Sequence, residues 1–152
     1  MTLLDAQKYD FARARRRRIT IGIVIAVILI VLVVGWMNRY WREKRVADHF
    51  FAALQKKDYE TAYGIYFADP GWQQHPQNHA QYSYSDFYRD WGPGGDWGVI
   101  QNYEVYGAAA CPGSGRGVVV DAVVNHRQEH AQVWVENGTH AISLPPCTLE
   151  FR

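Results

Sequence analysis

The sequence of 152 residues has only two cysteines and almost no net charge, with 16 basic and 15 acidic side chains. Two cysteines are too few for a small fold built on disulfides, and a formal charge of +1 excludes a strongly basic nucleic-acid binder. A disordered chain is also excluded, because such chains are poorer in large apolar residues than the 48% hydrophobic content found here. The composition therefore describes at most one ordinary globular domain.

The near-zero charge is the sum of two opposite parts. Residues 1–45 carry ten Lys or Arg and three Asp or Glu, which gives +7. Residues 46–152 carry six Lys or Arg and twelve Asp or Glu, which gives −6. A basic leader therefore precedes an acidic domain.

Charge is absent from the nineteen consecutive residues 19–37, which read ITIGIVIAVILIVLVVGWM. A helix of this length spans about 28 Å, close to the hydrocarbon thickness of a bilayer. A cleaved signal peptide would have a shorter apolar run followed by small residues, whereas Asn38 and Arg39 follow this one. A buried core helix would need a larger partner domain than the remaining residues provide. The run predicts an uncleaved transmembrane helix over 19–37, after a basic cytoplasmic tail over 1–18.

Basic residues flank the apolar run on both sides, with a larger excess before it than in the juxtamembrane linker expected over 38–45. This excess favours an N-terminus in the cytoplasm and a C-terminal domain on the other side of the cell (inner) membrane. The arginine block indicates a topology signal beside anionic headgroups rather than a nucleic-acid site. The expected membrane-interface anchors are Arg15, Arg16, Arg17, Arg18, Trp36, Tyr40 and Trp41.

The two cysteines, Cys111 and Cys147, bear on the same orientation. A disulfide between them would stabilise the domain by about 3–4 kcal/mol and would persist only in an oxidising compartment. The alternative is two free thiols in loops rich in proline. The sequence alone leaves both open.

The acidic part changes from helical to β patterning along its length. Apolar stripes predict helices over 46–57 and 59–68, with Asp58 as the N-cap of the second, and Ser83 to Asp86 offers cap chemistry for a short third helix. Strands are expected over 99–110, 117–125, 130–136 and 139–144, with a resumption over 147–151; Asn137-Gly138 is a hairpin signal. The order is that of an α+β domain over 46–152, with two to three helices on one face of a curved antiparallel four-stranded sheet.

Two segments carry a resemblance to a known superfamily. Residues 46–67 read VADHFFAALQKKDYETAYGIYF and residues 118–142 read VVVDAVVNHRQEHAQVWVENGTHAI. They are similar to the opening helix pair and the closing strands of the nuclear-transport-factor-2-like (cystatin-like) superfamily. The hairpin departs from that pattern, since Thr139-His140 stands where these proteins usually have a tryptophan.

The resemblance implies an enzyme, a small-ligand binder or a protein interaction module, and fold alone does not choose among them. An isomerase or dehydratase would need an inward-facing carboxylate or histidine pair, and the acids on predicted elements, Asp86, Asp90, Glu104 and Asp121, match no catalytic motif. Asp121 has the opposite parity to its apolar strand neighbours and is expected on the other face of the sheet. No catalytic residue and no cofactor is predicted.

Two histidine pairs have the spacing of four that zinc sites use on helices, His75 with His79 and His126 with His130. Neither pair lies on a predicted helix, so solvated surface histidines and no metal are expected. Asn137-Gly138-Thr139 is formally a glycosylation sequon, but the triplet doubles as the hairpin turn.

Aromatic residues are dense between 82 and 106, where eight rings occur in 25 residues. Some must serve the core, but tyrosine and tryptophan are also enriched at protein interfaces. A partner interface is therefore predicted at Tyr84, Tyr88, Trp91 and Trp97.

These features together predict a non-catalytic single-pass membrane subunit whose outer domain serves assembly or docking. The layout resembles the bitopic scaffold components of type IV secretion systems, and it equally suits an accessory subunit of a respiratory or photosynthetic complex. Membrane lipid and other membrane subunits are the expected partners, with no nucleic acid. The alternative is a membrane-tethered ligand binder with Phe50, Phe51, Leu54 and Tyr63 walling a pocket.

Overall fold

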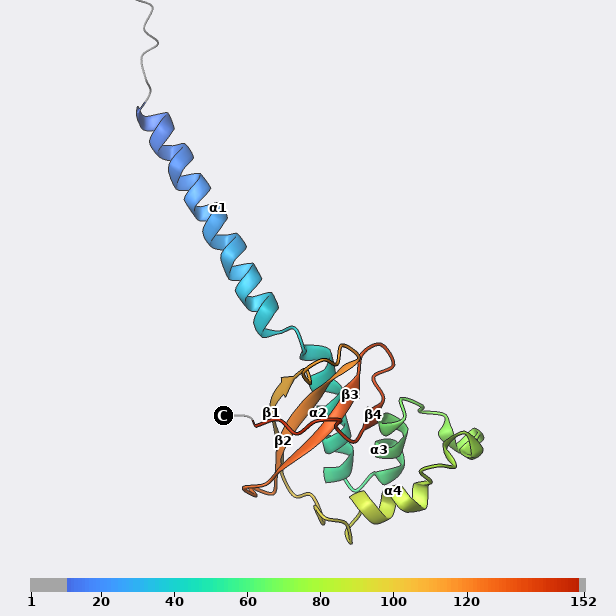
Figure 1. Cartoon of the computed structure of the whole chain (residues 1–152). Coiled ribbons are helices and arrows are strands. Elements are labelled where there is room, and N and C mark those ends of the chain that lie inside the picture. The colour runs from blue at the N-terminus through green and yellow to red at the C-terminus, as the bar shows by residue number, and fades with distance from the viewer. Residues whose placement is uncertain (1–10, 151–152) are drawn as a thin grey trace, which may run out of the picture. The chain divides into compact units, whose positions relative to one another are not determined.

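The computed structural model describes residues 11–150, with side chains from residue 15 onward, and the chain divides into two units between Arg39 and Tyr40. Residues 1–10 of the expected cytoplasmic tail lie outside the described residues, as do the last two residues. The first unit holds the long helix α1, and the second is an α+β domain with four antiparallel strands (Figure 1).

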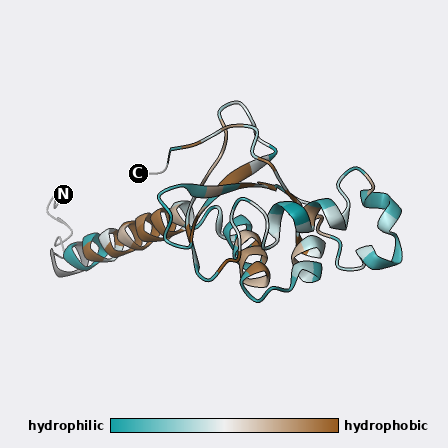
Figure 2. Cartoon of the chain, turned by 90° about the horizontal axis from the view of Figure 1, so that it is seen from below, coloured by the Kyte–Doolittle hydropathy of each residue, from teal (hydrophilic) through white to brown (hydrophobic). Residues whose placement is uncertain are grey.

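Helix α1 runs over Phe11–Met37 and so begins before the expected apolar span, because the arginine block continues the helix. Its large apolar side chains, from Ile19 to Met37, are each at least 48% exposed. Nothing in the described part of the chain buries this helix, which is long and apolar enough to cross a membrane. Figure 2 shows mostly hydrophobic colouring along the part of this helix that follows its hydrophilic first turns.

The helices of the second unit are α2 (Trp41–Gln55), α3 (Tyr59–Tyr66) and α4 (Tyr84–Trp91). Two short 3₁₀ helices, η1 (Trp72–Gln74) and η2 (Pro76–His79), lie between α3 and α4. Helix α2 begins five residues earlier than expected, so most of the linker predicted over 38–45 is helical. Arg42, Glu43 and Lys44 are good helix formers, and they extend the apolar-periodic segment backwards.

The predicted caps of the two following helices are confirmed. Asp58 accepts a hydrogen bond from the Thr61 backbone N–H at 3.1 Å at the start of α3. Ser83 and Asp86 form a reciprocal capping box at the start of α4, in which each side chain accepts from the other's backbone N–H. These local bonds satisfy donors that a helix start otherwise leaves unpaired.

The strands are β1 (Tyr103–Ala109), β2 (Gly117–Val124), β3 (His130–Glu136) and β4 (Ile142–Ser143), joined in the order β1-β2-β3-β4. Every neighbouring pair is antiparallel. The helices of the domain lie on one side of the sheet, and the C-terminal segment lies on the other (Figure 2). The α+β class expected from the sequence is therefore present.

Strand β1 starts four residues later than predicted, because the Asn125 side chain binds the backbone of the residues that were expected to begin it. The Asn125 side-chain oxygen accepts from the backbone N–H of Gln101 at 2.8 Å and of Asn102 at 3.3 Å, and its amide donates to the Val99 carbonyl. Asn125 itself has a positive φ of 53°, which asparagine tolerates better than most residues. A side chain thus replaces the ladder bonds of the expected strand.

Strand β4 is only two residues long, and no strand follows it within the described residues. Pro145 and Pro146 cannot donate ladder hydrogen bonds, so pairing ends at Ser143. The strand expected over 147–151 is, up to residue 150, an irregular segment that crosses the opposite face of the sheet.

The core is filled by large side chains from the helices packed on the β2 and β3 valines. Phe50 lies at its centre, with its ring 5.0 Å from Trp91 and 6.2 Å from Phe87, both edge to face. The four residues expected to wall a ligand pocket, Phe50, Phe51, Leu54 and Tyr63, are all buried members of this core. The space between helices and sheet is therefore packed with side chains.

Candidate functional site

The face of the sheet opposite the helices carries a buried polar cluster, which we call the covered face. Asp121 on β2 is 0% exposed, and among the described residues it is the one charged side chain that is buried. Its carboxylate lies 2.6 Å from His130 Nδ1 and accepts from the Gln132 amide at 3.1 Å. Asp121 lies on the face of the sheet opposite the core, as its parity in the strand predicts, and the C-terminal segment buries it there.

The C-terminal segment is fastened to the covered face at two points. Gln132 donates its amide to the Leu149 carbonyl and accepts from the Leu149 backbone N–H at 3.2 Å. A disulfide joins Cys111 to Cys147 and packs against Val119, Trp134 and Leu149 in a second, smaller apolar cluster. The cover is therefore held by both a covalent and a polar contact.

The Asp121–His130 pair resembles the carboxylate and the histidine of a hydrolase catalytic triad, whose third member is a nucleophile. A carboxylate on Nδ1 fixes the tautomer of a histidine and presents Nε2 outward, and the His130 side chain is 30% exposed. The hollow beside it, about 610 Å³, has Thr148 as the one hydroxyl among its lining residues. Threonine is a weak nucleophile unless a base and oxyanion donors activate it. We therefore interpret the Asp121–His130 pair as a structural contact.

The aromatic segment predicted as an interface is mainly part of the core. Trp91 packs edge to face on Phe50 and Phe51, and Tyr84 stacks on Trp72 with ring centroids 5.2 Å apart. Trp97 also packs against the core while the Arg127 guanidinium lies 5.7 Å above its ring. Within the predicted set, Tyr88 is the ring that is open to solvent, at 44% exposure.

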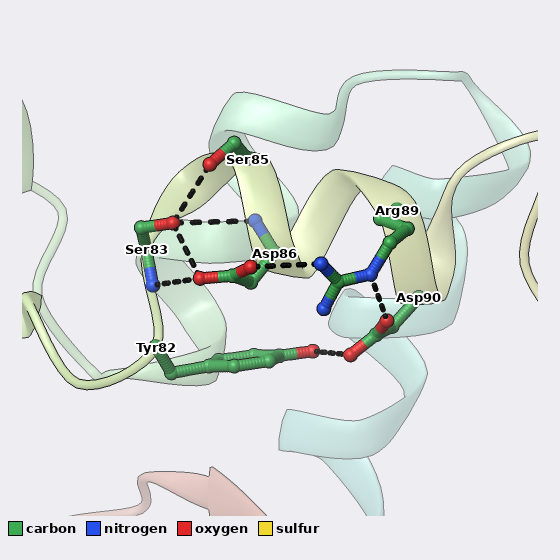
Figure 3. A network of polar contacts seen from close by, with 6 residues as sticks. All are labelled: Tyr82, Ser83, Ser85, Asp86, Arg89 and Asp90. Atoms are coloured by element: carbon green, nitrogen blue, oxygen red, sulfur yellow. Dashed lines mark hydrogen bonds and ion pairs between the residues drawn. The ribbon is translucent and has the colours of Figure 1, made fainter.

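Figure 3 shows a polar network around α4 that joins the Tyr82 ring to the acidic and basic side chains of this helix. Tyr82 donates its hydroxyl to Asp90 at 3.0 Å, and Arg89 bridges Asp90 and Asp86 at 3.2 Å and 3.0 Å. Burial, and then the hydrogen bond to Asp90, raise the pKa of Tyr82 well above its usual range. The phenol therefore remains a hydrogen-bond donor throughout the physiological pH range.

The histidines expected to be solvated are instead joined to one carboxylate. Asp69 Oδ2 lies 2.7 Å from His75 Nε2 and 2.9 Å from His79 Nε2, and the Gly71 backbone N–H donates to Oδ1 at 3.1 Å. The other pair does not form a cluster, because His130 is engaged by Asp121. Across the described side chains, no group of three or more His, Cys, Asp or Glu residues could hold a metal ion.

The hydrogen bond from His79, followed by those from His75 and Gly71, holds the pKa of Asp69 below its ordinary value of 3.8. A carboxyl whose pKa is depressed on folding contributes stability above its unfolded pKa, and this contribution is lost as the pH falls through the folded pKa. We therefore expect Asp69→Asn to be less stable than the wild type at neutral pH.

The difference in unfolding free energy should shrink below about pH 4 and be lost as the pH falls through the lowered pKa of folded Asp69. Chemical denaturation followed at a series of pH values measures it, with Glu104→Gln as an exposed acidic control. A difference between wild type and Asp69→Asn that persists unchanged to pH 2 would contradict this role.

The expected membrane-interface residues all lie on helices or beside them. Arg15 to Arg18 are exposed on α1. The Arg39 guanidinium lies 5.2 Å from the Trp36 ring, and that of Arg45 lies 5.1 Å from the Trp41 ring. Cations stacked on exposed tryptophans suit the headgroup region, where both groups find partners.

Comparison with known proteins adds no family: no family model, curated protein or solved structure matches the chain.

The features that sequence reasoning missed are the Asp69 cluster, the covered face and the Asn125 side-chain bonds. The spacing of His75 and His79 signalled the first, since Asp69 precedes them in the same loop. The other two depend on contacts between segments far apart in the sequence.

Proposed function

We propose that the protein is a non-catalytic single-pass membrane subunit whose C-terminal domain serves assembly or docking in a larger membrane complex. The observation that carries the proposal is the exposure of every large apolar side chain of α1 from Ile19 to Met37. In water such a surface would cost about 25 cal/mol for each Å² left exposed, whereas in a bilayer it is solvated by lipid. Membrane lipid is therefore its natural environment.

Two independent features support the orientation that we propose. The arginine block Arg15–Arg18 precedes the apolar run and favours the cytoplasmic side. The disulfide Cys111–Cys147 belongs to the domain that follows the run, and such a bond persists in an oxidising compartment. The N-terminus is thus cytoplasmic, and the domain is extracytoplasmic at the cell (inner) membrane.

A docking role fits the domain better than catalysis. The similarity of residues 46–67 and 118–142 to the nuclear-transport-factor-2-like superfamily allows enzymes, but enzymes of that fold need an open polar pocket between helices and sheet. Here Phe50, Phe51 and Tyr63 fill that space. The partner would be another subunit of a secretion, respiratory or photosynthetic type of complex.

The docking surface is best tested at Tyr88, which is exposed on α4 and packs edge to face on Tyr59 at 5.0 Å. Alanine variants of Trp91 or Trp97 would disturb the core and so would not isolate binding. We expect a photo-crosslinking residue at Tyr88 to form a defined adduct with a membrane subunit in native membranes, and Tyr88→Ala to weaken co-purification about tenfold.

Tyr106 provides the matched control, because it is exposed to a similar degree but belongs to β1, where its ring packs beside that of His130. The same substitutions there should leave the adduct and the co-purification unchanged. Equal co-purification of Tyr88→Ala and the wild type, with the domain folded in both, would count against this surface.

A further inference from the structure

A second hollow of the domain combines aromatic walls with acidic residues, and we call it the aromatic hollow. Four rings, those of Tyr66, Tyr82, Trp91 and Trp97, line it. Asp90 and Asp96 line it as well, and its volume of about 560 Å³ lies within the range of small-molecule sites. The lining contains no lysine, arginine or histidine.

From this composition we propose that the aromatic hollow binds a small quaternary ammonium cation of the choline type. Aromatic faces carry negative charge density and attract cations that lack a tight hydration shell. The exposed Asp96 carboxylate adds a longer-range attraction, and residues 46–152, which contain the hollow, carry a net charge of −6. An anion would meet repulsion from every one of these groups.

One contact already present in the domain uses the same chemistry. The Arg127 guanidinium lies 5.7 Å from the centroid of the Trp97 ring, so this ring accepts a cation on one face. Arg127 donates at 2.7 Å to the backbone carbonyl of Asp96 rather than to its carboxylate. The exposed Asp96 carboxylate is therefore available to a bound cation.

A quaternary ammonium fits the hollow better than a primary ammonium. A primary ammonium has three N–H donors, each of which needs an acceptor when it leaves water. The Asp90 carboxylate already accepts from Tyr82 on one oxygen and from Arg89 on the other (Figure 3), so Asp96 is the one carboxylate of the lining left to serve three donors. A methylated cation needs no acceptor, and its methyl groups contact rings and the 80% exposed Leu144 at the rim.

The test is calorimetric titration of the full chain, in an uncharged maltoside detergent, with choline chloride. The control ligand is 3,3-dimethylbutan-1-ol, which has the shape of choline without its charge. We expect saturable choline binding at millimolar concentrations or below, and at least tenfold weaker binding of the alcohol. Equal binding of the two compounds, or no saturable choline binding up to about 50 mM, would overturn the proposal.

Substitutions assign the binding to this hollow. Trp97→Leu keeps an apolar side chain but removes the ring, and it should weaken choline binding about tenfold, whereas Tyr106→Leu outside the hollow should not. Asp96→Asn changes an exposed residue without disturbing the core and should weaken binding about threefold at low salt, with Glu104→Gln as its control. Wild-type affinity in both Trp97→Leu and Asp96→Asn would overturn the site.

A further titration with glycerophosphocholine distinguishes the source of the cation. Affinity equal to that of choline supports the proposal with a phosphocholine headgroup as the source, since the phosphate is then accommodated. Weaker binding supports it with a free solute, because the two carboxylates then repel the phosphate.

Discussion

Replacement of both Cys111 and Cys147 by serine is expected to lower the unfolding free energy of the domain by about 4 kcal/mol. The cysteines are separated by 36 residues, and the loop-entropy relation gives this value for a loop of that length. The bond also holds the C-terminal segment over the covered face, so its loss should let water reach Asp121 and Trp134. We expect the melting temperature to fall by about 15–25 °C.

Tryptophan fluorescence during thermal unfolding measures this effect in the full chain, since Trp134 lies in the affected cluster. The wild type treated with reductant should match the double variant. Cys111→Ala with Cys147→Ala should behave like the serine pair, which separates loss of the bond from the introduction of hydroxyls. Melting within about 2 °C of the oxidised wild type would show that the bond does not stabilise the domain.

Three arginines in the apolar run are expected to abolish membrane insertion. Arginine at the centre of a transmembrane helix costs about 2.5–3.5 kcal/mol on insertion scales, whereas each Ile or Leu contributes about −0.3 to −0.6 kcal/mol. Replacement of Ile25, Ile28 and Leu32 by arginine therefore raises the free energy of membrane insertion by about 8–12 kcal/mol. This exceeds the total favourable contribution of the apolar run.

Fractionation with alkaline carbonate measures the result, which should be loss of the variant from the membrane pellet. Ile25→Leu, Ile28→Leu and Leu32→Ile change the same positions without charge and should remain in the pellet. Retention of the arginine variant would mean that α1 is held by protein contacts rather than by lipid. The two outcomes thus separate a membrane helix from a helix that another subunit covers.

The features predicted from sequence are those in which a few neighbouring residues decide the outcome. Asp58 and Ser83 cap helices because their side chains reach backbone donors three residues away. Asn137-Gly138 begins the turn between β3 and β4, where Gly138 adopts a φ of +91°. The strand expected over 139–144 is wrong in its bounds, because the connection runs over 137–141, with His140 also at a positive φ, and β4 begins at Ile142. The alternating valines of β2 likewise placed the core face correctly, with Asp121 on the other side.

The features that were missed depend on partners distant in the sequence. Asp121 is buried because residues near 149 fold back over it, and nothing in the pattern of β2 records that cover. Asn125 ends β2 and replaces the first ladder bonds of β1, 24 residues earlier in the chain. These contacts are set by the tertiary packing of segments and not by local periodicity.

The aromatic segment shows the same limit in another form. Its density predicted an interface, whereas most of its rings pack on the core, and spacing on a helix of eight residues did not separate Trp91, which packs on Phe50, from Tyr88, which is exposed. The allocation of rings to core or surface depends on how α2 and α3 pack against α4. The candidate interface is therefore narrower than the sequence predicted.

The most direct test of the proposed arrangement is the location of the C-terminal domain in cells. Two reporters are fused separately to the end of the chain. Alkaline phosphatase is active only outside the cytoplasm, whereas green fluorescent protein fluoresces in the cytoplasm and only poorly after export. The proposal predicts an active phosphatase and a dark fluorescent protein, both in the membrane fraction. An inactive phosphatase with a bright fluorescent protein would place the domain in the cytoplasm and contradict the account.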